Sequence, residues 1–549
     1  MITGIALVIL GAASAATPCE NLVHISFKDA TISSAAIVPE GPPPARGGGG
    51  GGGRGGGGRG GGAAAPAGQQ GAGNAPALQP GGAGGGAGAT GAGARGGGAR
   101  GGGAPAAPPA NIPEHCKVVM VLKPTSDSLI NMELWLPTKN WNGKFMGVGN
   151  GGFAGSIQGL SNEMPQAIRL GYATAGTDTG HQDQGGAWAI GHPEKMIDFG
   201  YRATHEMTLK AKEIVKEFYD QSAKFSYFKG CSTGGRMAVM EAQRYPDDYD
   251  GIIAGSLANR HIHMWTAGFA ESIELSRHPE AQVTTEQATL VTNLVMSKCD
   301  TLKEGFLNNP NQCKVDFSAL KCAPGKADNT CLTDPQLKTV ETYYGGLKNS
   351  KGELIFSGRP LGNAMTAQRG VGANGPGATF DLMRIAKNDP NVDWHTFDLD
   401  RDMKFLDKEI GYVDAVNPDL SKFKKSGGKL LITHGWADPS ITPENTVLYY
   451  ESVLDKMGKN QSDWMRLFMV PGMAHCGGGP GVNTFDSIGT LEKWVEKDIA
   501  PDQMMGTGAN GLTRPLCPYP QAAEYKGSGD LKDAANWVCK QPAVESKKK

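Results

Sequence analysis

The stretch Lys229-Gly230-Cys231-Ser232-Thr233-Gly234-Gly235 lies between two segments with different periodicities. The residues before it, Phe225 to Phe228, are aromatic and typical of a strand, whereas Arg236 to Arg244 has the pattern of a helix. Ser232 is therefore expected in a tight turn that joins a strand to a helix. The five central residues also fit the pattern G-x-S-x-G without a mismatch, although so short a match also occurs by chance.

A serine on such a turn is where α/β-hydrolases expose their nucleophile, and a nucleophile needs a base. His475 is our candidate for the base, because Cys476 follows it just as Cys231 precedes Ser232. A disulfide between the two cysteines would hold their Cα atoms roughly 5.5 Å apart. The serine and the histidine would then lie side by side.

An acid is needed to orient the imidazole, and Asp438 is our candidate for it. It follows the run Lys429 to Thr433, which has the composition of a buried strand. The order Ser232, Asp438, His475 along the chain is the order of the triad in α/β-hydrolases. We therefore predict an α/β fold with an α/β-hydrolase core, and these three residues as its catalytic set.

Asp178 and His181 are an alternative acid and base, at and just after the end of another strand-like run, Tyr172 to Asp178. Neither lies at the position that the order of the triad requires. We expect them instead to hydrogen-bond the loops around the site.

Gly149-Asn150-Gly151-Gly152-Phe153 is a glycine-rich loop after the strand-like run Lys144 to Val148. Such loops can hold phosphate, but this one matches neither the P-loop pattern nor a convincing dinucleotide-binding pattern. In a hydrolase, bare backbone can approach the oxyanion of the reaction intermediate. We predict that the backbone N–H groups of Gly151 and Thr233 form the oxyanion hole.

Taken together, these motifs resemble the tannase and feruloyl esterase family, which includes the mono(hydroxyethyl) terephthalate hydrolases. That family combines Cys-Ser, Asp and His-Cys with a disulfide, and the matching residues here are Cys231-Ser232, Asp438 and His475-Cys476. The resemblance covers roughly Asn111 to Cys539. Further stretches that look like the family are Trp141-Asn142-Gly143-Lys144-Phe145, Gly149-Asn150-Gly151-Gly152, Thr177-Asp178-Thr179-Gly180-His181 and Tyr245-Pro246-Asp247-Asp248-Tyr249-Asp250-Gly251.

The chain has 10 cysteines, an even number that suits an oxidising compartment. Zinc binding is the competing interpretation, but the sequence holds no C-x-x-C pair. The pairing that the resemblance implies, and that the spacing allows, is Cys19 with Cys116, Cys231 with Cys476, Cys299 with Cys313, Cys322 with Cys331, and Cys517 with Cys539.

The 549 residues divide by composition and motif into six segments. A strand is expected at His24 to Phe27, in the second of them. The segments are a signal peptide (1–15), an N-terminal segment of the core (16–40), a disordered Gly/Ala/Pro-rich segment (41–110), the first part of the core (111–257), a lid domain (258–425) and the second part of the core (426–549).

Residues 1–15 combine an apolar run with Ala13-Ser14-Ala15, a small-x-small cleavage pattern. A short buried strand is the alternative, and the lack of Lys or Arg before the run suggests that the true start lies upstream. No later apolar run reaches the ~18 residues of a membrane span. We expect a secreted or periplasmic protein with no membrane partner.

Residues 41–110 offer almost only Gly, Ala and Pro, with scattered Arg, Gln and Asn, so they have nothing to bury and are expected to be disordered. Arginines within glycine runs also occur in RNA-binding segments. Aromatic residues are absent here, however, and the net charge of the chain is −1. We therefore prefer a linker or insertion and expect no nucleic-acid partner.

The long insertion between the expected nucleophile and the expected acid is interpreted as a lid. The resemblance implies that the lid selects the substrate and often holds calcium. Here the acidic loop after Cys299 looks shortened and leaves only Asp300 and Glu304 as plausible acidic ligands. Calcium prefers six to eight oxygen ligands, so a structural calcium is doubtful.

From these observations we predict a secreted serine esterase. The resemblance implies substrates that are esters of small aromatic acids, of the feruloyl, galloyl or terephthaloyl type. The chemistry requires no cofactor. Two alternatives stay open: a serine hydrolase that acts on another ester or on an amide, and a binding module without catalysis on the same fold.

Overall fold

The computed structural model describes residues 17–43, 110–157, 162–183 and 185–542. The expected signal peptide, and all of the expected linker except its first three residues and its last, lie outside the described residues. The account below concerns the unit that Met1–Pro44 and Asn111–Lys549 form.

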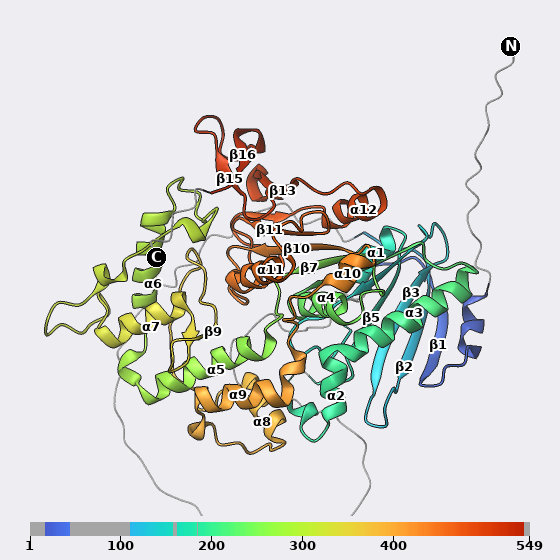
Figure 1. The fold of residues 1–549 in the computed structure, drawn as a ribbon, viewed down its shortest axis with the longest axis horizontal. Coiled ribbons are helices and arrows are strands. Elements are labelled where there is room, and N and C mark those ends of the chain that lie inside the picture. The colour runs from blue at the N-terminus through green and yellow to red at the C-terminus, as the bar shows by residue number, and fades with distance from the viewer. Residues whose placement is uncertain (1–16, 44–109, 158–161, 184, 543–549) are drawn as a thin grey trace, which may run out of the picture. The chain divides into compact units, whose positions relative to one another are not determined.

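A nine-stranded sheet runs through the core (Figure 1). Its first three pairings, β1–β2, β2–β3 and β3–β5, are antiparallel, and all later pairings are parallel. In sheet order the strands are β1 (Ala30–Val38), β2 (His115–Leu122), β3 (Ile130–Pro137), β5 (Ala173–Thr177), β4 (Lys144–Val148), β6 (Phe225–Cys231), β7 (Gly251–Gly255), β10 (Lys429–Gly435) and β11 (Met465–Val470).

Helices cover both faces of the sheet, as parallel strands require. One apolar cluster joins the sheet to α3 (Ala203–Tyr219), α4 (Thr233–Arg244) and α11 (Pro443–Met457). A second joins the opposite face to α1 (Glu163–Arg169) and α12 (Ser487–Lys497). In β10, Leu430 belongs to the first cluster and Leu431 to the second, because successive side chains of a strand point to opposite faces. The predicted α/β core is confirmed.

An insertion between β7 and β10 carries its own helices and small apolar clusters. Two of its helices begin with capping boxes, at Thr284 with Gln287 and at Thr333 with Gln336. The two glutamines also bond to each other, with 3.0 Å between Nε2 of Gln287 and Oε1 of Gln336. The elements are α5 (His261–Arg277), α6 (Thr285–Cys299), α7 (Asp334–Gly345), β8 (Leu347–Lys348), β9 (Leu354–Phe356), α8 (Asp381–Lys387), α9 (Leu399–Ile410) and α10 (Ser421–Lys425), and α2 (Pro193–Ile197) lies near them in Figure 1.

The C-terminal part adds small sheets beside β11, drawn in red in Figure 1. Five disulfides join the described cysteines in the pairing that the sequence analysis gave. No helix among the described residues is long and apolar enough to cross a membrane. The added strands are β12 (Val482–Thr484), β13 (Met504–Gly508), β14 (Thr513–Leu516), β15 (Ala522–Tyr525) and β16 (Trp537–Lys540).

The strand expected at His24 to Phe27 is wrong. Cys19–His24 forms a 3-10 helix, and the first strand is Ala30–Val38. The longer segment pairs with β2 along its whole length, which satisfies far more backbone groups than four residues could.

Candidate active site

Ser232 lies in the turn between β6 and α4, where a strand-to-helix turn was predicted. Its φ of 65° and ψ of −125° are strained for a residue with a side chain. The turn is tight because glycines allow close contact: a Cβ on Gly230 would lie 2.3 Å from the carbonyl oxygen of Gly234, and one on Gly235 would lie 2.2 Å from that of Gly255. No larger residue fits at either position without moving the backbone.

The disulfide between Cys231 and Cys476 ties the turn to the segment after β11, with 6.0 Å between the Cα atoms. Each cysteine is the chain neighbour of a candidate catalytic residue, Ser232 or His475. β6, β10 and β11 are parallel, so the residues after them gather at one edge of the sheet.

Asp438 follows β10 and is fully buried. Its Oδ2 lies 2.8 Å from Nδ1 of His475, and its Oδ1 accepts hydrogen bonds from the N–H groups of Ser440 and Ile441 at 2.8 and 3.0 Å. Burial alone would raise the pKa of Asp438, but the hydrogen bonds from His434 and His475 outweigh burial and lower it. The carboxylate therefore stays ionised and can fix the orientation of His475.

Two residues around Asp438 did not enter the sequence-based site. His434 is fully buried, and its Nε2 lies 3.1 Å from Oδ2 of Asp438 and 3.2 Å from the carbonyl oxygen of Ile441. Both of those atoms accept, so Nε2 carries a proton, and Nδ1 lies 2.6 Å from the Thr446 hydroxyl oxygen. His434 lies in β10 and Asp438 in the loop after it, so no regular spacing in the sequence marks the pair.

Asn363, in the insertion, donates from Nδ2 to the carbonyl oxygen of Asp438 at 2.6 Å. It is 75 positions away in the chain. No local pattern marks it, because the contact depends on how the insertion packs.

The glycine-rich loop after β4 is fastened to the start of α4. The N–H of Gly234 donates to the Asn150 carbonyl at 2.6 Å, and the Thr233 hydroxyl donates to the Gly152 carbonyl at 2.7 Å. A Cβ on Gly149 would lie 2.5 Å from the Cα of Gly234. The loop therefore lies directly against the turn that carries Ser232.

Asp178 holds loops together, as expected. Its carboxylate accepts from the backbone of Asn131 and Gly180, both at 2.9 Å, and burial raises its pKa to about 6. The hydrogen bonds expected of His181 are not found, since neither of its ring nitrogens has a partner among the described residues. Its ring stacks on the indole of Trp188 with 3.7 Å between centroids, and burial lowers its pKa to about 4. The candidate triad contains neither residue.

One group of described residues has the composition of a metal site: His205, Glu241 and Asp248, whose ligand atoms lie within 4.8 Å of one another. His205 already contacts Asp248, at 2.6 Å, and the Lys212 ammonium donates to the Asp248 backbone carbonyl. With a protein cation this close, we assign no metal there. Glu241 is fully buried, and neither of its carboxylate oxygens has a hydrogen-bond partner.

We expect Glu241→Gln to raise the Tm at pH 8 by about 2–5 °C, and to change it little at pH 5. Burial and then the Asp248 carboxylate raise the pKa of Glu241 well above its ordinary value. Above pH ~4.3 the folded state therefore binds more protons than the unfolded state, and stability falls as the pH rises. Glutamine removes this dependence. Thermal melts across pH measure this dependence, with the exposed Glu217→Gln as control. Parallel profiles of Tm against pH for wild type and Glu241→Gln would contradict the prediction.

The family model described as tannase and feruloyl esterase matches residues 116–540. The chain belongs to this family. It is therefore an esterase. A relative of Xanthomonas campestris, called an uncharacterized esterase, is 32% identical over 491 residues, which cover 78% of this chain and 84% of the relative.

Fungal members of the family are equally similar to this esterase. A probable feruloyl esterase B-1 of Aspergillus oryzae is 33% identical over 455 residues, which cover 77% of this chain and 83% of the relative. The crystal structure of feruloyl esterase B from Aspergillus oryzae aligns with a TM-score of 0.77 at 28% identity, and covers 95% of this chain and 99% of that chain. The shared fold extends over the core and the insertion.

Proposed function

We propose that this esterase uses Ser232, His475 and Asp438 as a catalytic triad and hydrolyses carboxylic esters of small aromatic acids outside the cell. One observation carries the triad: His475 bonds to a buried, ionised Asp438, while a disulfide ties its neighbour Cys476 to the residue before Ser232. This is the arrangement of roles that serine hydrolysis needs.

The hydrogen bond from Nδ1 of His475 to Asp438 leaves Nε2 as the base. Nε2 takes the proton of Ser232 as its Oγ attacks the ester carbonyl, and Asp438 stabilises the resulting imidazolium. The proton then passes to the leaving alcohol and an acyl-enzyme forms. Water repeats the same steps on the acyl-enzyme and releases the acid and the free serine.

The oxyanion hole is proposed at the backbone N–H groups of Thr233 and Gly151. Thr233 is the first residue of α4, where N–H groups have no partner within the helix. The contacts that fasten the glycine-rich loop to Thr233 and Gly234 support a second donor from that loop.

The insertion packs on the loop that carries Asp438. Nη1 of Arg359 donates to the Pro439 carbonyl at 2.7 Å, and the Thr442 hydroxyl donates to the Gly358 carbonyl at 2.5 Å. A pocket of about 400 Å³ opens beside these contacts, lined among others by Arg359 and Trp436 but by none of the three triad candidates. A site that the insertion partly covers suits a small aromatic acid better than a long acyl chain.

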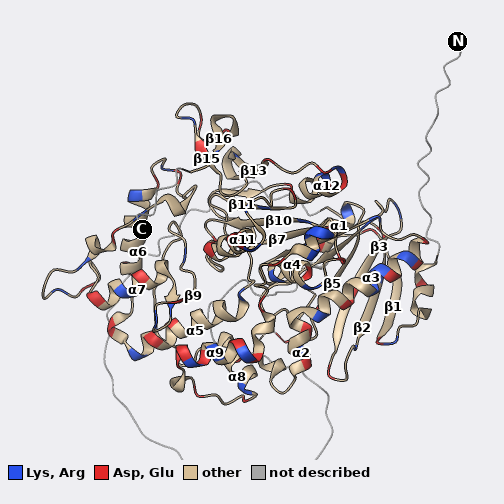
Figure 2. Ribbon diagram, in the orientation of Figure 1, with Lys and Arg blue, Asp and Glu red and all other residues tan. Residues whose placement is uncertain are grey.

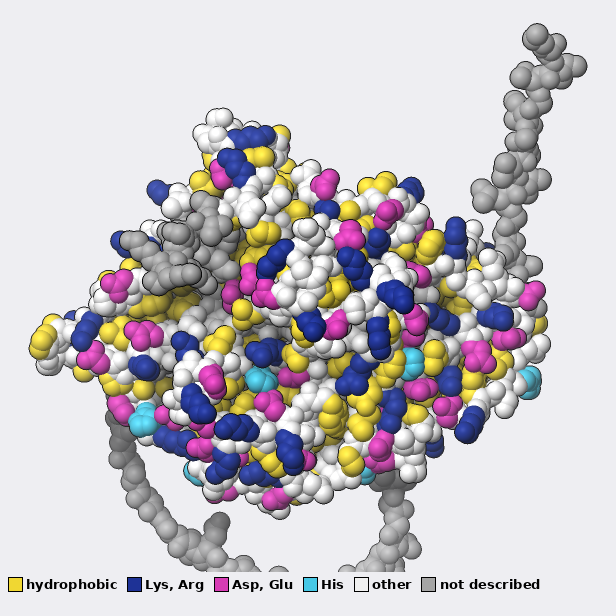
Figure 3. Space-filling view, in the orientation of Figure 1, with side chains coloured by type: hydrophobic (Ala, Val, Ile, Leu, Met, Phe, Trp, Pro, Cys, Tyr) yellow, Lys and Arg dark blue, Asp and Glu magenta, His cyan; other side chains and the backbone are white. Residues whose placement is uncertain are grey.

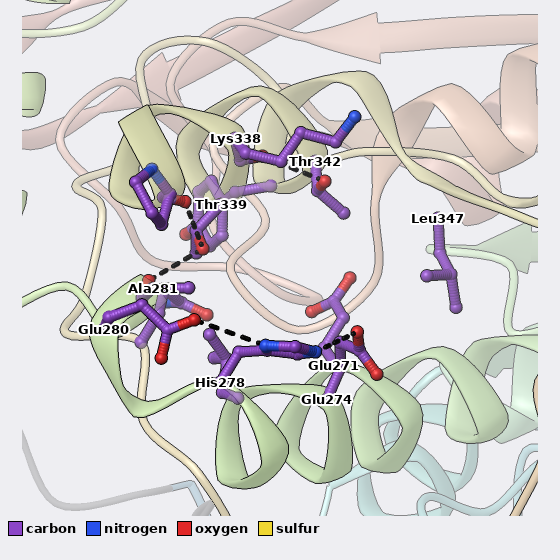
Figure 4. Close-up of a pocket in the computed structure, with 13 residues that line it drawn as sticks. Glu271, Glu274, His278, Glu280, Ala281, Lys338, Thr339, Thr342 and Leu347 are labelled. Atoms are coloured by element: carbon purple, nitrogen blue, oxygen red, sulfur yellow. Dashed lines mark hydrogen bonds and ion pairs between the residues drawn. The ribbon is translucent and has the colours of Figure 1, made fainter. Parts of the chain in front are cut away.

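A second pocket, of about 330 Å³, lies within the insertion between α5 and α7 (Figure 4). His278 lies there between Glu274 and Glu280, at 3.4 and 3.3 Å. Its lining comes from the insertion alone, whereas the first pocket is lined by Trp436, two positions before Asp438. We therefore do not assign the substrate to it.

We expect kcat/KM for methyl ferulate, methyl gallate or mono(hydroxyethyl) terephthalate to exceed that for emulsified long-chain triglycerides at least tenfold. The named feruloyl esterase relatives and the insertion that packs on the loop of Asp438 support this expectation. p-Nitrophenyl acetate serves as the control for general esterase activity. A triglyceride that is hydrolysed as well as every aromatic ester would contradict the substrate class and leave the triad intact.

Export is proposed from the five disulfides, since such bonds persist in oxidising compartments.

The absence of a nucleic-acid partner stays an expectation. On the face in Figure 3, basic side chains are interspersed with acidic ones, and the described helices in Figure 2 carry both signs.

A further inference from the structure

The sequence left only Asp300 and Glu304 as plausible acidic ligands in the loop after Cys299, too few for the calcium site that the resemblance implies. In the structure the Asp300 carboxylate is used by the loop itself: Oδ1 accepts from the N–H of Glu304 at 3.0 Å, and Oδ2 from the N–H of Gly305 at 2.8 Å. These bonds close a turn directly after Cys299. Glu304 is thereby placed to point away from Asp300, toward the C-terminal strands.

Glu304 binds a protein cation. Nη2 of Arg514, on β14, lies 2.7 Å from Oε1 of Glu304, and Nη1 lies 3.4 Å from Oε2. The Arg514 side chain is fully buried and that of Glu304 is 7% exposed. The same guanidinium donates to the side-chain oxygen of Asn308 and, at 3.0 Å, to the Leu531 carbonyl.

The remaining face of the guanidinium is also covered, because it lies 3.3 Å from the centroid of the Trp537 ring. The cation is thus held by a carboxylate, two further oxygens and an aromatic face, and only its Nε has no hydrogen-bond partner among the residues that the structure describes. The donor set does not fit calcium, since Arg514 already occupies the carboxylate oxygens that the ion would need.

The same loop also packs against the segment that delivers His475. Phe306 is 4% exposed and belongs to the apolar cluster that contains Phe468, Val470 and Met473. A Cβ on Gly472 would lie 2.7 Å from Cγ of Phe306. Phe306 therefore packs directly against the turn between β11 and His475.

We propose that the Arg514 guanidinium serves as the cation of the loop from Asp300 to Phe306, in the place of a divalent ion. Through Phe306, Arg514 also positions His475. Arg514 is a positioning residue, since it touches no reacting atom. The second half of the proposal rests on the proposed triad, whereas the first half does not.

The first experiment uses the unmodified enzyme. We expect the same Tm and the same kcat in EDTA and in millimolar CaCl₂ or MgCl₂, because the loop already holds its cation. A Tm that rises with calcium or falls with EDTA would contradict the proposal that Arg514 takes the place of a divalent ion. This arm needs no active site, so a failure of the triad assignment does not affect it.

The second experiment replaces Arg514 with methionine, which keeps the length of the side chain but leaves the Glu304 carboxylate buried without a cation. We expect the Tm to fall by about 5–10 °C. In the folded enzyme we expect kcat to fall at least tenfold with little change in KM. The rate constant for labelling by a fluorophosphonate, per titrated active site, should fall in parallel, because that rate reports how well His475 activates the serine.

Arg514→Lys should lie between wild type and Arg514→Met, since lysine keeps the charge but not the two-pronged contact. The matched control is Lys540→Met, which removes a half-exposed ion pair with Glu524 in the same region and should change neither quantity. If Arg514→Met does not fold, Arg514→Lys decides the outcome. A lower Tm with an unchanged labelling rate would remove the positioning role, and an unchanged Tm would overturn the whole proposal.

Discussion

Ser232→Ala is expected to lower kcat/KM by about 10⁴-fold or more, because without the nucleophile only transition-state binding remains. The fold should persist, since alanine keeps the backbone contacts of the turn, such as the N–H of residue 232 to the Gly255 carbonyl at 3.1 Å. The measurement is hydrolysis of an aromatic ester together with a thermal melt. Ser297→Ala, on an exposed face of α6, is the matched control and should keep full activity.

Near-normal turnover by Ser232→Ala would end the serine-esterase mechanism. Fluorophosphonate labelling separates the rivals further. A non-catalytic binding module would leave wild type unlabelled, whereas the triad predicts labelling of wild type and none of Ser232→Ala.

Replacing Cys231 and Cys476 with alanine is expected to give the second largest loss of activity. The bridge closes a span of 245 residues, and the chain-entropy model assigns to it about 5 kcal/mol of stability. Its greater effect should be geometric, since it fixes the turn of Ser232 against the segment of His475. We expect kcat to fall at least a hundredfold in protein that is still folded.

The matched control removes the bridge between Cys322 and Cys331, which spans 9 residues within the lid. The same model assigns about 2–3 kcal/mol to it, so the Tm should fall while kcat is kept. Activity and fluorophosphonate labelling, both below the lower Tm, compare the two variants. Equal kcat in the two would show that the first bridge contributes stability alone.

The elements of the site that the sequence predicted were those with local signals. Glycines at fixed spacing marked the turn of Ser232, and cysteine neighbours marked Ser232 and His475. A buried run before Asp438 marked the acid. Each of these signals can be recognised in the sequence because it depends only on the few residues around it.

The elements that the sequence did not predict depend on packing between distant segments. Asn363, in the insertion, donates a hydrogen bond to the Asp438 carbonyl. Arg514 binds Glu304, which is 210 positions away in the chain. The strand at Ala30–Val38 was missed because apolar and polar residues do not alternate regularly along it. Its pairing with β2 makes this segment a strand.

The span of 245 residues between Cys231 and Cys476 also sets the order in which the molecule can be completed. At a synthesis rate of 5–20 residues per second, the first cysteine exists for about 12–50 s before its partner is made. During that time the four cysteines of the insertion emerge and offer it wrong partners. In the proposed triad, Ser232 gains its base only after the insertion, β10 and β11 are in place. The nascent chain would therefore carry the proposed nucleophile without catalytic power until most of it has been synthesised.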